Sequence, residues 1–208
     1  MRVQVACDLS SVDDAIEIVK KIKDDVEIIE CGTGLIFSEG CECIRKMKAA
    51  FPDKLVLADL KIMDGGVEHC ELVFKAGADL VTVMGVAPDE TIKKVCDTTK
   101  KWGKECVVDM MCVNDQMSRA KDIISWGANY LCLHTADDQK DTITFYHFLK
   151  DLVAEIGAEH CSIAGGMNPE NILGIKEYKP DTIIVGGYIT RAADPVKAVR
   201  EVRKAMED

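Results

Sequence analysis

Short apolar runs alternate along this chain with longer stretches in which apolar residues recur three and four positions apart. Short apolar runs suit strands that are buried on both faces, and the longer pattern is typical of amphipathic helices. We therefore expect strands at Val3–Asp8, Val26–Glu30, Lys54–Asp59, Asp79–Met84, Glu105–Met110, Asn129–His134, His160–Ala164 and Thr182–Gly186.

The boundaries of the predicted helices carry local signals. The clearest helical patterns span Asp13–Lys23, Thr91–Lys101 and Pro195–Met206. Each of these helices has a candidate N-cap, a residue whose side chain can accept a hydrogen bond from the first helical turn. The candidates are Ser10 or Ser11, Asp89 and Asp194. Glycine at the C-terminal end of a helix favours a left-handed cap, as predicted at Gly77 and Gly127.

Eight strand–helix units in 208 residues predict a (β/α)8 TIM barrel that forms a single domain over residues 1–208. The alternative is a doubly wound open sheet. Such a sheet often carries a Gly-x-Gly-x-x-Gly turn after its first strand, where this chain has Asp8-Leu9-Ser10-Ser11. The sequence therefore favours the barrel.

The net charge of −10 argues against a general surface for nucleic acid or for anionic membranes, because both need clustered Lys and Arg. No apolar run approaches the roughly twenty residues of a transmembrane helix, and Met1-Arg2 leads directly into the first predicted strand. We expect a cytoplasmic protein without nucleic-acid or membrane partners.

Ten cysteines would suggest disulfides in a small secreted protein, but most of them lie inside apolar periodic segments. We expect free, buried thiols. The pair Cys41-Glu42-Cys43 lacks the spacing of a structural zinc site.

Ionisable residues gather at the C-terminal ends of the predicted strands, where TIM barrels carry their active sites. Each one alone has a simpler explanation, such as a helix cap or a surface histidine. Several buried charges at one edge are costly unless a ligand or partner compensates them, which favours a functional site. These residues are Asp8, Glu30, Asp59, Lys61, Asp109 and His134.

The densest group follows the third predicted strand. Because strand side chains alternate, Asp59 and Lys61 are expected on one face. Asp64 follows, and Gly65-Gly66 allow a sharp turn into a helix. A purely structural salt bridge is the alternative interpretation.

The seventh and eighth predicted strands end in glycine pairs, Gly165-Gly166 and Gly186-Gly187. Backbone N–H groups in loops at these positions bind phosphate in many TIM barrels. We therefore expect a phosphate site there.

With these motifs the chain resembles the orotidine monophosphate decarboxylase superfamily, in its branch of 3-hexulose-6-phosphate synthases and 3-keto-L-gulonate-6-phosphate decarboxylases. The resemblance covers essentially the whole chain. It is carried by Asp59-x-Lys61-x-x-Asp64-Gly65-Gly66, Ile28–Thr33, Asp109–Val113, His134-Thr135 and Gly186–Pro195.

The resemblance implies a Mg²⁺ ion bound with the help of Glu30 and Asp59, and Lys61 in contact with the substrate and intermediate. It implies a homodimer in which Asp64 reaches the active site of the partner subunit. Asp8, Asp109 and His134 would line the substrate. The candidate catalytic residues are Lys61, Asp59, Asp64, His134 and Asp109, and the candidate substrate-binding residues are Asp8, Glu30, Gly165, Gly166, Gly186 and Gly187.

Both activities of the branch imply a 1,2-enediolate derived from a sugar phosphate, whose adjacent anionic oxygens a divalent cation and an ammonium group would stabilise. The synthase condenses ribulose 5-phosphate with formaldehyde, with His134 as the candidate for proton transfer. The decarboxylase forms the enediolate by loss of carbon dioxide.

Three positions favour the synthase over the decarboxylase. Asp109 stands where the decarboxylase pattern has Glu, and Asp137 and Gly187 stand where it has Arg. The segment after His134 departs from the synthase pattern His-Thr-Gly-Tyr-Asp, because it reads Thr135-Ala136-Asp137-Asp138. The decarboxylase therefore remains the alternative.

A binding protein and an enzyme of another kind are the remaining alternatives. A catalytically silent sugar-phosphate-binding protein would not need the charged set at Asp59, Lys61 and Asp64. A phosphopentose epimerase would need a histidine-rich metal site, and of four histidines His134 alone stands at a clear strand end.

Overall fold

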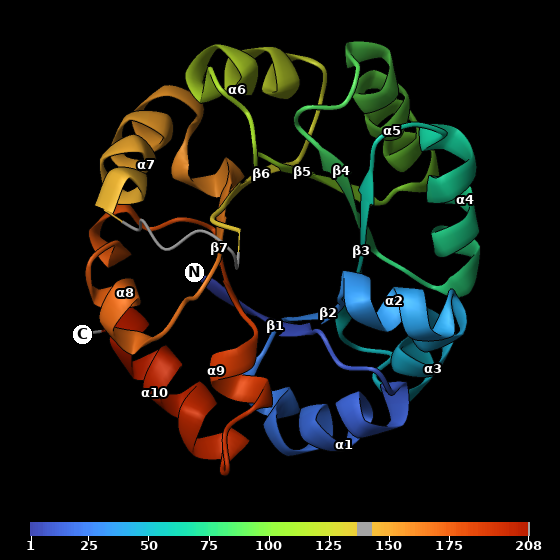
Figure 1. The fold of residues 1–208 in the computed structure, drawn as a ribbon, viewed down its shortest axis with the longest axis vertical. Helices are drawn as coiled ribbons and strands as arrows, with labels where there is room; N and C mark the ends of the chain where they lie inside the picture. The colour runs from blue at the N-terminus through green and yellow to red at the C-terminus, as the bar shows by residue number, and fades with distance from the viewer. Residues whose placement is uncertain (137–142, 208) are drawn as a thin grey trace.

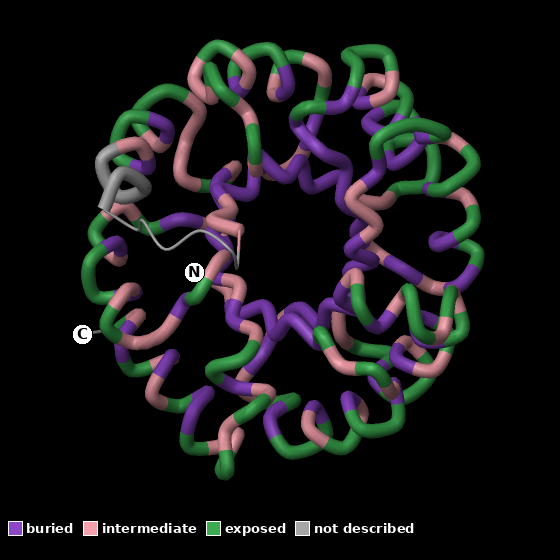
Figure 2. Tube along the Cα trace, viewed as in Figure 1, coloured by how far each residue is buried: buried purple, intermediate pink, exposed green. Residues whose placement is uncertain are grey.

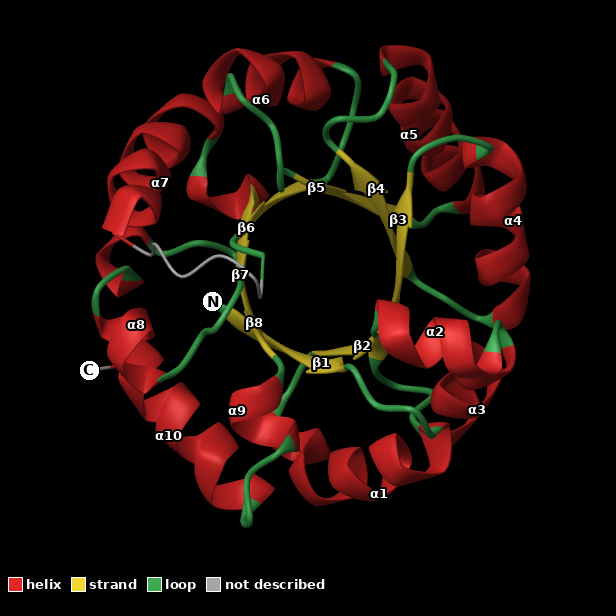
Figure 3. Ribbon diagram, in the orientation of Figure 1, coloured by secondary structure: helices red, strands yellow, loops and turns green. Residues whose placement is uncertain are grey.

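Eight parallel strands close into a barrel in the order β1 to β8, each paired with its neighbours in sequence and β8 with β1. The computed structural model describes residues 1–136 and 143–207. Figures 1 and 3 show the strands as a ring surrounded by helices. The strands are β1 (Arg2–Cys7), β2 (Ile28–Cys31), β3 (Leu55–Ile62), β4 (Leu80–Met84), β5 (Glu105–Asp109), β6 (Tyr130–His134), β7 (Cys161–Ala164) and β8 (Thr182–Val185).

The connections between strands are helical, and three short 3-10 turns supplement the α-helices. The helices are α1 (Val12–Ile22), α2 (Thr33–Glu39), α3 (Glu42–Ala50), α4 (Gly66–Ala76), α5 (Asp89–Trp102), α6 (Gln116–Ser125), α7 (Ile143–Ile156), α8 (Pro169–Leu173), α9 (Gly187–Thr190) and α10 (Pro195–Glu207). The predicted barrel and its eight strands are confirmed.

The helix caps follow the predicted chemistry with one exception. The Ser11 side chain accepts a hydrogen bond from the Asp14 N–H at 3.3 Å, and Asp194 accepts one from the Lys197 N–H at 3.0 Å. The prediction of Asp89 as an N-cap is wrong. The cap is Pro88, and Asp89 is the first residue of α5, where its charge favours the helix N-terminus. Gly77 ends α4 in the predicted left-handed conformation.

The strand β3 is longer and less regular than its pattern predicts. It continues past Asp59 to Ile62, and Lys61 has a φ angle of +47°, in the left-handed region. The register with β4 passes from Ala58 opposite Val81 to Ile62 opposite Val83. Period-two alternation cannot predict such a bulge, because it assumes that each strand residue has one partner.

Apolar side chains fill two layers. The larger layer lies between the outside of the barrel and the helices, and Figure 2 shows the buried positions on the strands and on the inner sides of the helices. A smaller cluster fills the barrel interior and consists of Ile28, Leu57, Leu80, Val107, Cys132 and Ala164. The strands are therefore buried on both faces, against the helices on their outer faces and within the barrel interior on their inner faces.

The cysteines are free, as predicted. Eight are buried, Cys41 is half-buried and Cys112 is exposed. Burial raises the pKa of the Cys70 and Cys161 thiols to about 12, which keeps them protonated at neutral pH. Within residues 1–136 and 143–207 we find no helix of the length and apolarity needed to cross a bilayer.

We predict that Leu80→Ala lowers the free energy of unfolding by about 2–5 kcal/mol, because it leaves a cavity inside the barrel. Leu80 is 1% exposed. Chemical denaturation at fixed protein concentration measures the change. Leu173→Ala is the matched control, since Leu173 is 52% exposed and its loss is expected to cost within about 0.5 kcal/mol. Equal effects of the two substitutions would contradict the interior cluster.

Candidate active site

A cavity of about 780 Å³ opens at the C-terminal ends of the strands. Its floor is apolar, because Leu57, Val107, Cys132 and Ala164 belong both to its lining and to the interior cluster. All but one of the candidate site residues line it: Asp8, Glu30, Asp59, Lys61, Asp109, His134, Gly165, Gly166, Gly186 and Gly187. The expected convergence of strand ends is therefore observed.

Asp59 and Lys61 form an ion pair at the end of β3. Burial alone would raise the pKa of Asp59, but the charge of Lys61 and hydrogen bonds from Lys61, Thr33 and Thr82 hold it below its ordinary value. Burial likewise opposes the charge on Lys61, and Asp59 outweighs it and raises the lysine pKa. Both groups are therefore charged at neutral pH.

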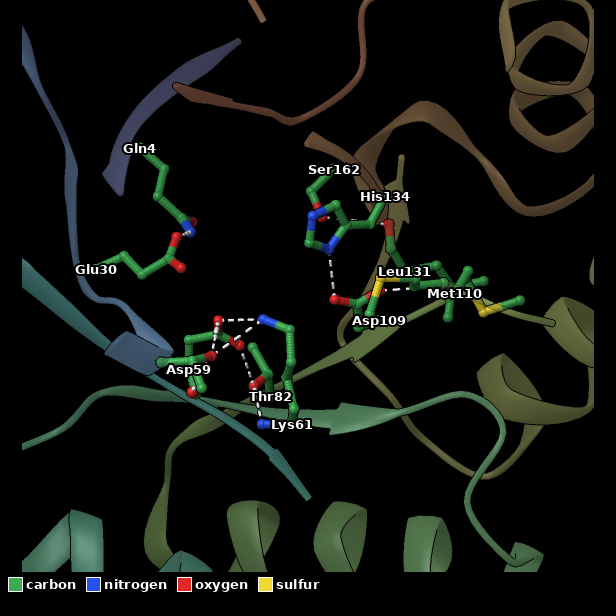
Figure 4. A network of polar contacts seen from close by, with 12 residues as sticks. Gln4, Glu30, Asp59, Lys61, Thr82, Asp109, Met110, Leu131, His134 and Ser162 are labelled. Atoms are coloured by element: carbon green, nitrogen blue, oxygen red, sulfur yellow. Dashed lines mark hydrogen bonds and ion pairs between the residues drawn. The ribbon is translucent and has the colours of Figure 1, made fainter. Parts of the chain in front are cut away.

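Glu30 lies on β2, the strand next to β3, and Figure 4 shows its carboxylate on the same side of the site as Asp59. Its Oε2 accepts a hydrogen bond of 2.6 Å from Gln4 Nε2. Burial, reinforced by the negative charge of Asp59, raises the pKa of Glu30 well above its ordinary value. A positive charge that enters the cavity would therefore stabilise the ionised form of Glu30.

The donor set of Glu30 and Asp59 fits a hard divalent cation. Mg²⁺ is commonly bound by one or two carboxylates, with its other ligands from water and substrate oxygen atoms. Both side chains are buried, at 7% and 6% exposure, and line the same cavity. The described residues contain no group of three or more His, Cys, Asp or Glu side chains that could hold a metal, so protein ligands alone would not complete its shell.

His134 and Asp109 form a second polar pair, on the far side of the cavity from Glu30 (Figure 4). Asp109 Oδ2 lies 2.7 Å from His134 Nδ1, and Asp109 Oδ1 accepts a hydrogen bond of 2.9 Å from the Met111 N–H. Burial would lower the pKa of His134, but the Asp109 carboxylate outweighs it and raises the pKa. The carboxylate fixes the ring and leaves Nε2 for proton transfer.

The two glycine pairs lie at one rim of the cavity with Asn168 and Arg191. Gly165 has a φ angle of +100°, and a Cβ atom there would lie 2.2 Å from the Thr135 carbonyl oxygen. Position 165 therefore requires glycine both for its backbone conformation and for its close approach to the β6–α7 loop. The Arg191 guanidinium packs near Gly187, where a Cβ atom would lie 3.6 Å from Nε.

Asp8 lies at the cavity mouth beside Gly32. A Cβ atom on residue 32 would lie 2.2 Å from Asp8 Oδ1. Gly32 thus leaves the space that the Asp8 carboxylate occupies between the ends of β1 and β2.

Asp64 is the one candidate that lies outside this cavity as the described residues form it. It is exposed in the loop between β3 and α4, and its backbone oxygen contacts His69 Nδ1 at 3.1 Å. Gly65, with a φ angle of +60°, makes the predicted turn into α4. Asp137, which weighed in the choice between synthase and decarboxylase, lies outside the described residues.

Several polar residues of the site were not predicted from the sequence. Thr82 is a polar residue within an otherwise apolar strand, and that interruption was a usable signal. Thr33 lies in the motif Ile28–Thr33, but that motif predicted no role for its hydroxyl group. Arg191 stands at an unspecified position of the motif Gly186–Pro195, so no pattern indicated it.

Replacing Asp109 by Asn is expected to lower the pKa of His134, because burial then acts on the imidazolium without a neighbouring anion. NMR titration of the histidine ring signals measures the pKa. His160 serves as the internal control, since its Nδ1 contacts a backbone oxygen, that of Asn129, at 2.8 Å. An unchanged midpoint for His134 would contradict the pairing.

The same pair predicts a pH-dependent stability difference. The folded pKa of His134 is raised above its unfolded value of about 6.5, so its contribution is complete below that pH and is lost as pH rises through the folded pKa. The excess unfolding free energy of the parent over Asp109→Asn is therefore expected to shrink across that interval. Denaturation at a series of pH values tests the sign.

Comparison with known proteins agrees with this geometry. The model of the Orotidine 5'-phosphate decarboxylase / HUMPS family matches residues 1–202. A relative named 3-hexulose-6-phosphate synthase 2, from Staphylococcus saprophyticus, is 39% identical over 100% of this chain and 98% of its own. The crystal structure of 3-hexulose-6-phosphate synthase from Salmonella typhimurium matches with a TM-score of 0.91 and 37% identity, covering 100% of this chain and 99% of that one.

A third structure, 3-keto-L-gulonate-6-phosphate decarboxylase from Vibrio cholerae, has a TM-score of 0.89 but 26% identity, and covers 99% of this chain and 97% of that one. The synthase and the decarboxylase thus share the fold of this chain, whereas its sequence identity to the synthases compared is higher. With the family model covering nearly the whole chain, this protein belongs to the Orotidine 5'-phosphate decarboxylase / HUMPS family.

Proposed function

We propose that this protein is a 3-hexulose-6-phosphate synthase, an aldehyde-lyase that joins or separates ribulose 5-phosphate and formaldehyde. One observation carries the proposal. A single cavity brings the Asp59–Lys61 ion pair, the Asp109–His134 pair and Glu30 together with two glycine loops. The full-length identity to proteins of that name supports it.

The cavity has complementary ends for a sugar phosphate. The glycine loops after β7 and β8, with Arg191, would receive the phosphate through backbone N–H groups and one guanidinium. The sugar carbons would then extend toward Lys61, whose ammonium faces adjacent oxygens of the substrate. Asp59 keeps that ammonium protonated, so Lys61 acts as a charge and not as a Schiff-base nucleophile.

Glu30 and Asp59 would hold Mg²⁺ beside the same oxygens. The ion, when bound, supplies a Lewis-acid charge that lowers the energy of the enediolate. The apolar floor strengthens these electrostatic interactions because it excludes water.

His134 would move the proton. In the condensation, Nε2 takes the C1 proton of ribulose 5-phosphate, and the C–H electron pair enters the enediolate. C1 then forms a bond to the formaldehyde carbon while the carbonyl at C2 re-forms, and the oxygen of formaldehyde takes the proton from His134 Nε2. Asp109 holds the imidazole during both steps through Nδ1.

The decarboxylase is the second candidate, because its structures share the fold at a TM-score of 0.89. Its identity to this chain is lower, at 26% against 37–39% for the synthases. Gly187 and Asp109 also stand where the decarboxylase pattern has Arg and Glu.

We also infer a homodimer in which Asp64 enters the partner's cavity. The exposed position of Asp64, outside its own cavity, supports this arrangement. Exposed apolar side chains support it too, since Phe37 on α2 is 85% exposed and Met63, next to Asp64, is 48% exposed. The free thiols are in keeping with a reducing compartment such as the cytoplasm.

The purified protein, with Mg²⁺, is expected to consume formaldehyde in the presence of ribulose 5-phosphate. A parallel assay offers 3-keto-L-gulonate 6-phosphate and measures carbon dioxide. Lys61→Ala is expected to lower kcat by about 10²–10³-fold, because it removes the charge beside the enediolate. EDTA is expected to abolish turnover, and added Mg²⁺ to restore it.

Lys75→Ala is the matched control, because the Lys75 side chain is 63% exposed on α4. It should retain the parent's activity. Carbon dioxide release without formaldehyde consumption would replace the synthase by the decarboxylase. Activity in neither assay would reject both.

Coexpression of Lys61→Ala with Asp64→Ala tests the shared site. If each site takes Lys61 from one subunit and Asp64 from the other, the mixed dimer has one intact site, so the mixture recovers about a quarter of the parent's activity. Each variant alone is expected to be inactive. A mixture as inactive as the single variants would place Asp64 in the same subunit's site as Lys61, and an active Asp64→Ala variant would place Asp64 outside catalysis.

A further inference from the structure

The backbone of β3 leaves its regular ladder at the residues that carry the charges. Between the paired positions Ala58–Val81 and Ile62–Val83, β3 contains Asp59, Leu60 and Lys61, whereas β4 contains Thr82. Lys61 has a φ angle of +47°, in the left-handed region that is unfavourable for a residue other than glycine. A local contact must hold this conformation.

The Thr82 hydroxyl makes that contact in both directions. It accepts a hydrogen bond of 2.9 Å from the Lys61 N–H and donates one of 2.7 Å to Asp59 Oδ1. Thr82 is 6% exposed, so these bonds lie in a buried environment in which an unpaired partner is costly. Its single proton is committed to Asp59, which leaves none to donate to a substrate.

Thr33 holds the other end of the same pair. Its hydroxyl accepts a hydrogen bond of 3.1 Å from Lys61 Nζ and donates one of 2.6 Å to Asp59 Oδ2. Thr33 therefore fixes the lysine's tip, whereas Thr82 fixes its backbone. Both oxygens of Asp59 receive a threonine proton, and the carboxylate cannot rotate without losing one of them.

We propose that Thr82 is a positioning residue for the reaction, whose hydroxyl locks the bulge of β3 and thereby aims Asp59 and Lys61 into the cavity. This inference rests on the proposed function for its kinetic consequence. Its structural part, the conformation of Lys61, does not depend on which reaction the protein catalyses.

Two substitutions separate the hydroxyl from the shape of the side chain. Thr82→Val keeps the volume and removes the hydroxyl, and Thr82→Ser keeps the hydroxyl and removes the methyl group. Thr182→Val is the matched control, because Thr182 is also a buried strand threonine, 2% exposed, but lies at the start of β8 away from the cavity.

In the formaldehyde assay, Thr82→Val is expected to lower kcat by about 10–100-fold with KM within about 3-fold, since a displacement near 1 Å at the reacting groups has effects of that size. Thr82→Ser and Thr182→Val are expected to remain within about 3-fold of the parent. Crystal structures of the Thr82 variants give the second readout. Lys61 should leave the left-handed region in Thr82→Val and keep it in Thr82→Ser.

An unchanged Lys61 conformation in folded Thr82→Val would overturn the proposal, as would equal losses of kcat in the Val and Ser variants. If the parent is inactive but Lys61 relaxes in Thr82→Val alone, the positioning role stands and the proposed reaction fails. The two failures are thus distinguishable.

Discussion

An ammonium group and a carboxylate share the end of β3, and burial opposes the charge of each. Burial would raise the pKa of Asp59 and lower that of Lys61. The charge of each group outweighs the effect of burial on the pKa of the other. The surrounding groups follow from this constraint. Two threonine hydroxyls complete the hydrogen bonds of the carboxylate, and the β3 backbone departs from its ladder to place the lysine beside it.

The barrel interior contributes to both stability and chemistry. The apolar side chains that fill the barrel also form the floor beneath the charged groups. An apolar floor lowers the local dielectric constant, so fixed charges above it act on a substrate more strongly than they would in water. The same residues therefore support the fold from one side and the site from the other.

Regular features of this protein could be predicted from its sequence. Alternating apolar runs indicated parallel strands, and parallel strands in a barrel end at one edge, which brings Glu30, Asp109 and His134 together. Features that depend on irregular backbone could not be predicted. The bulge at Lys61 breaks the period on which strand prediction rests, and the role of Thr82 exists because of that bulge. The position of Asp64 outside the cavity depends on the path of the loop between β3 and α4, and residue types alone do not determine that path.

The bulge in β3 also limits how this protein can be stabilised. A shorter β3, matched residue for residue to β4, would restore the missing ladder pairs and remove the strained φ angle at Lys61. The result would be a more regular sheet without the bulge that places Lys61 beside Asp59. Under the proposed function, regularising this strand would therefore exchange activity for stability.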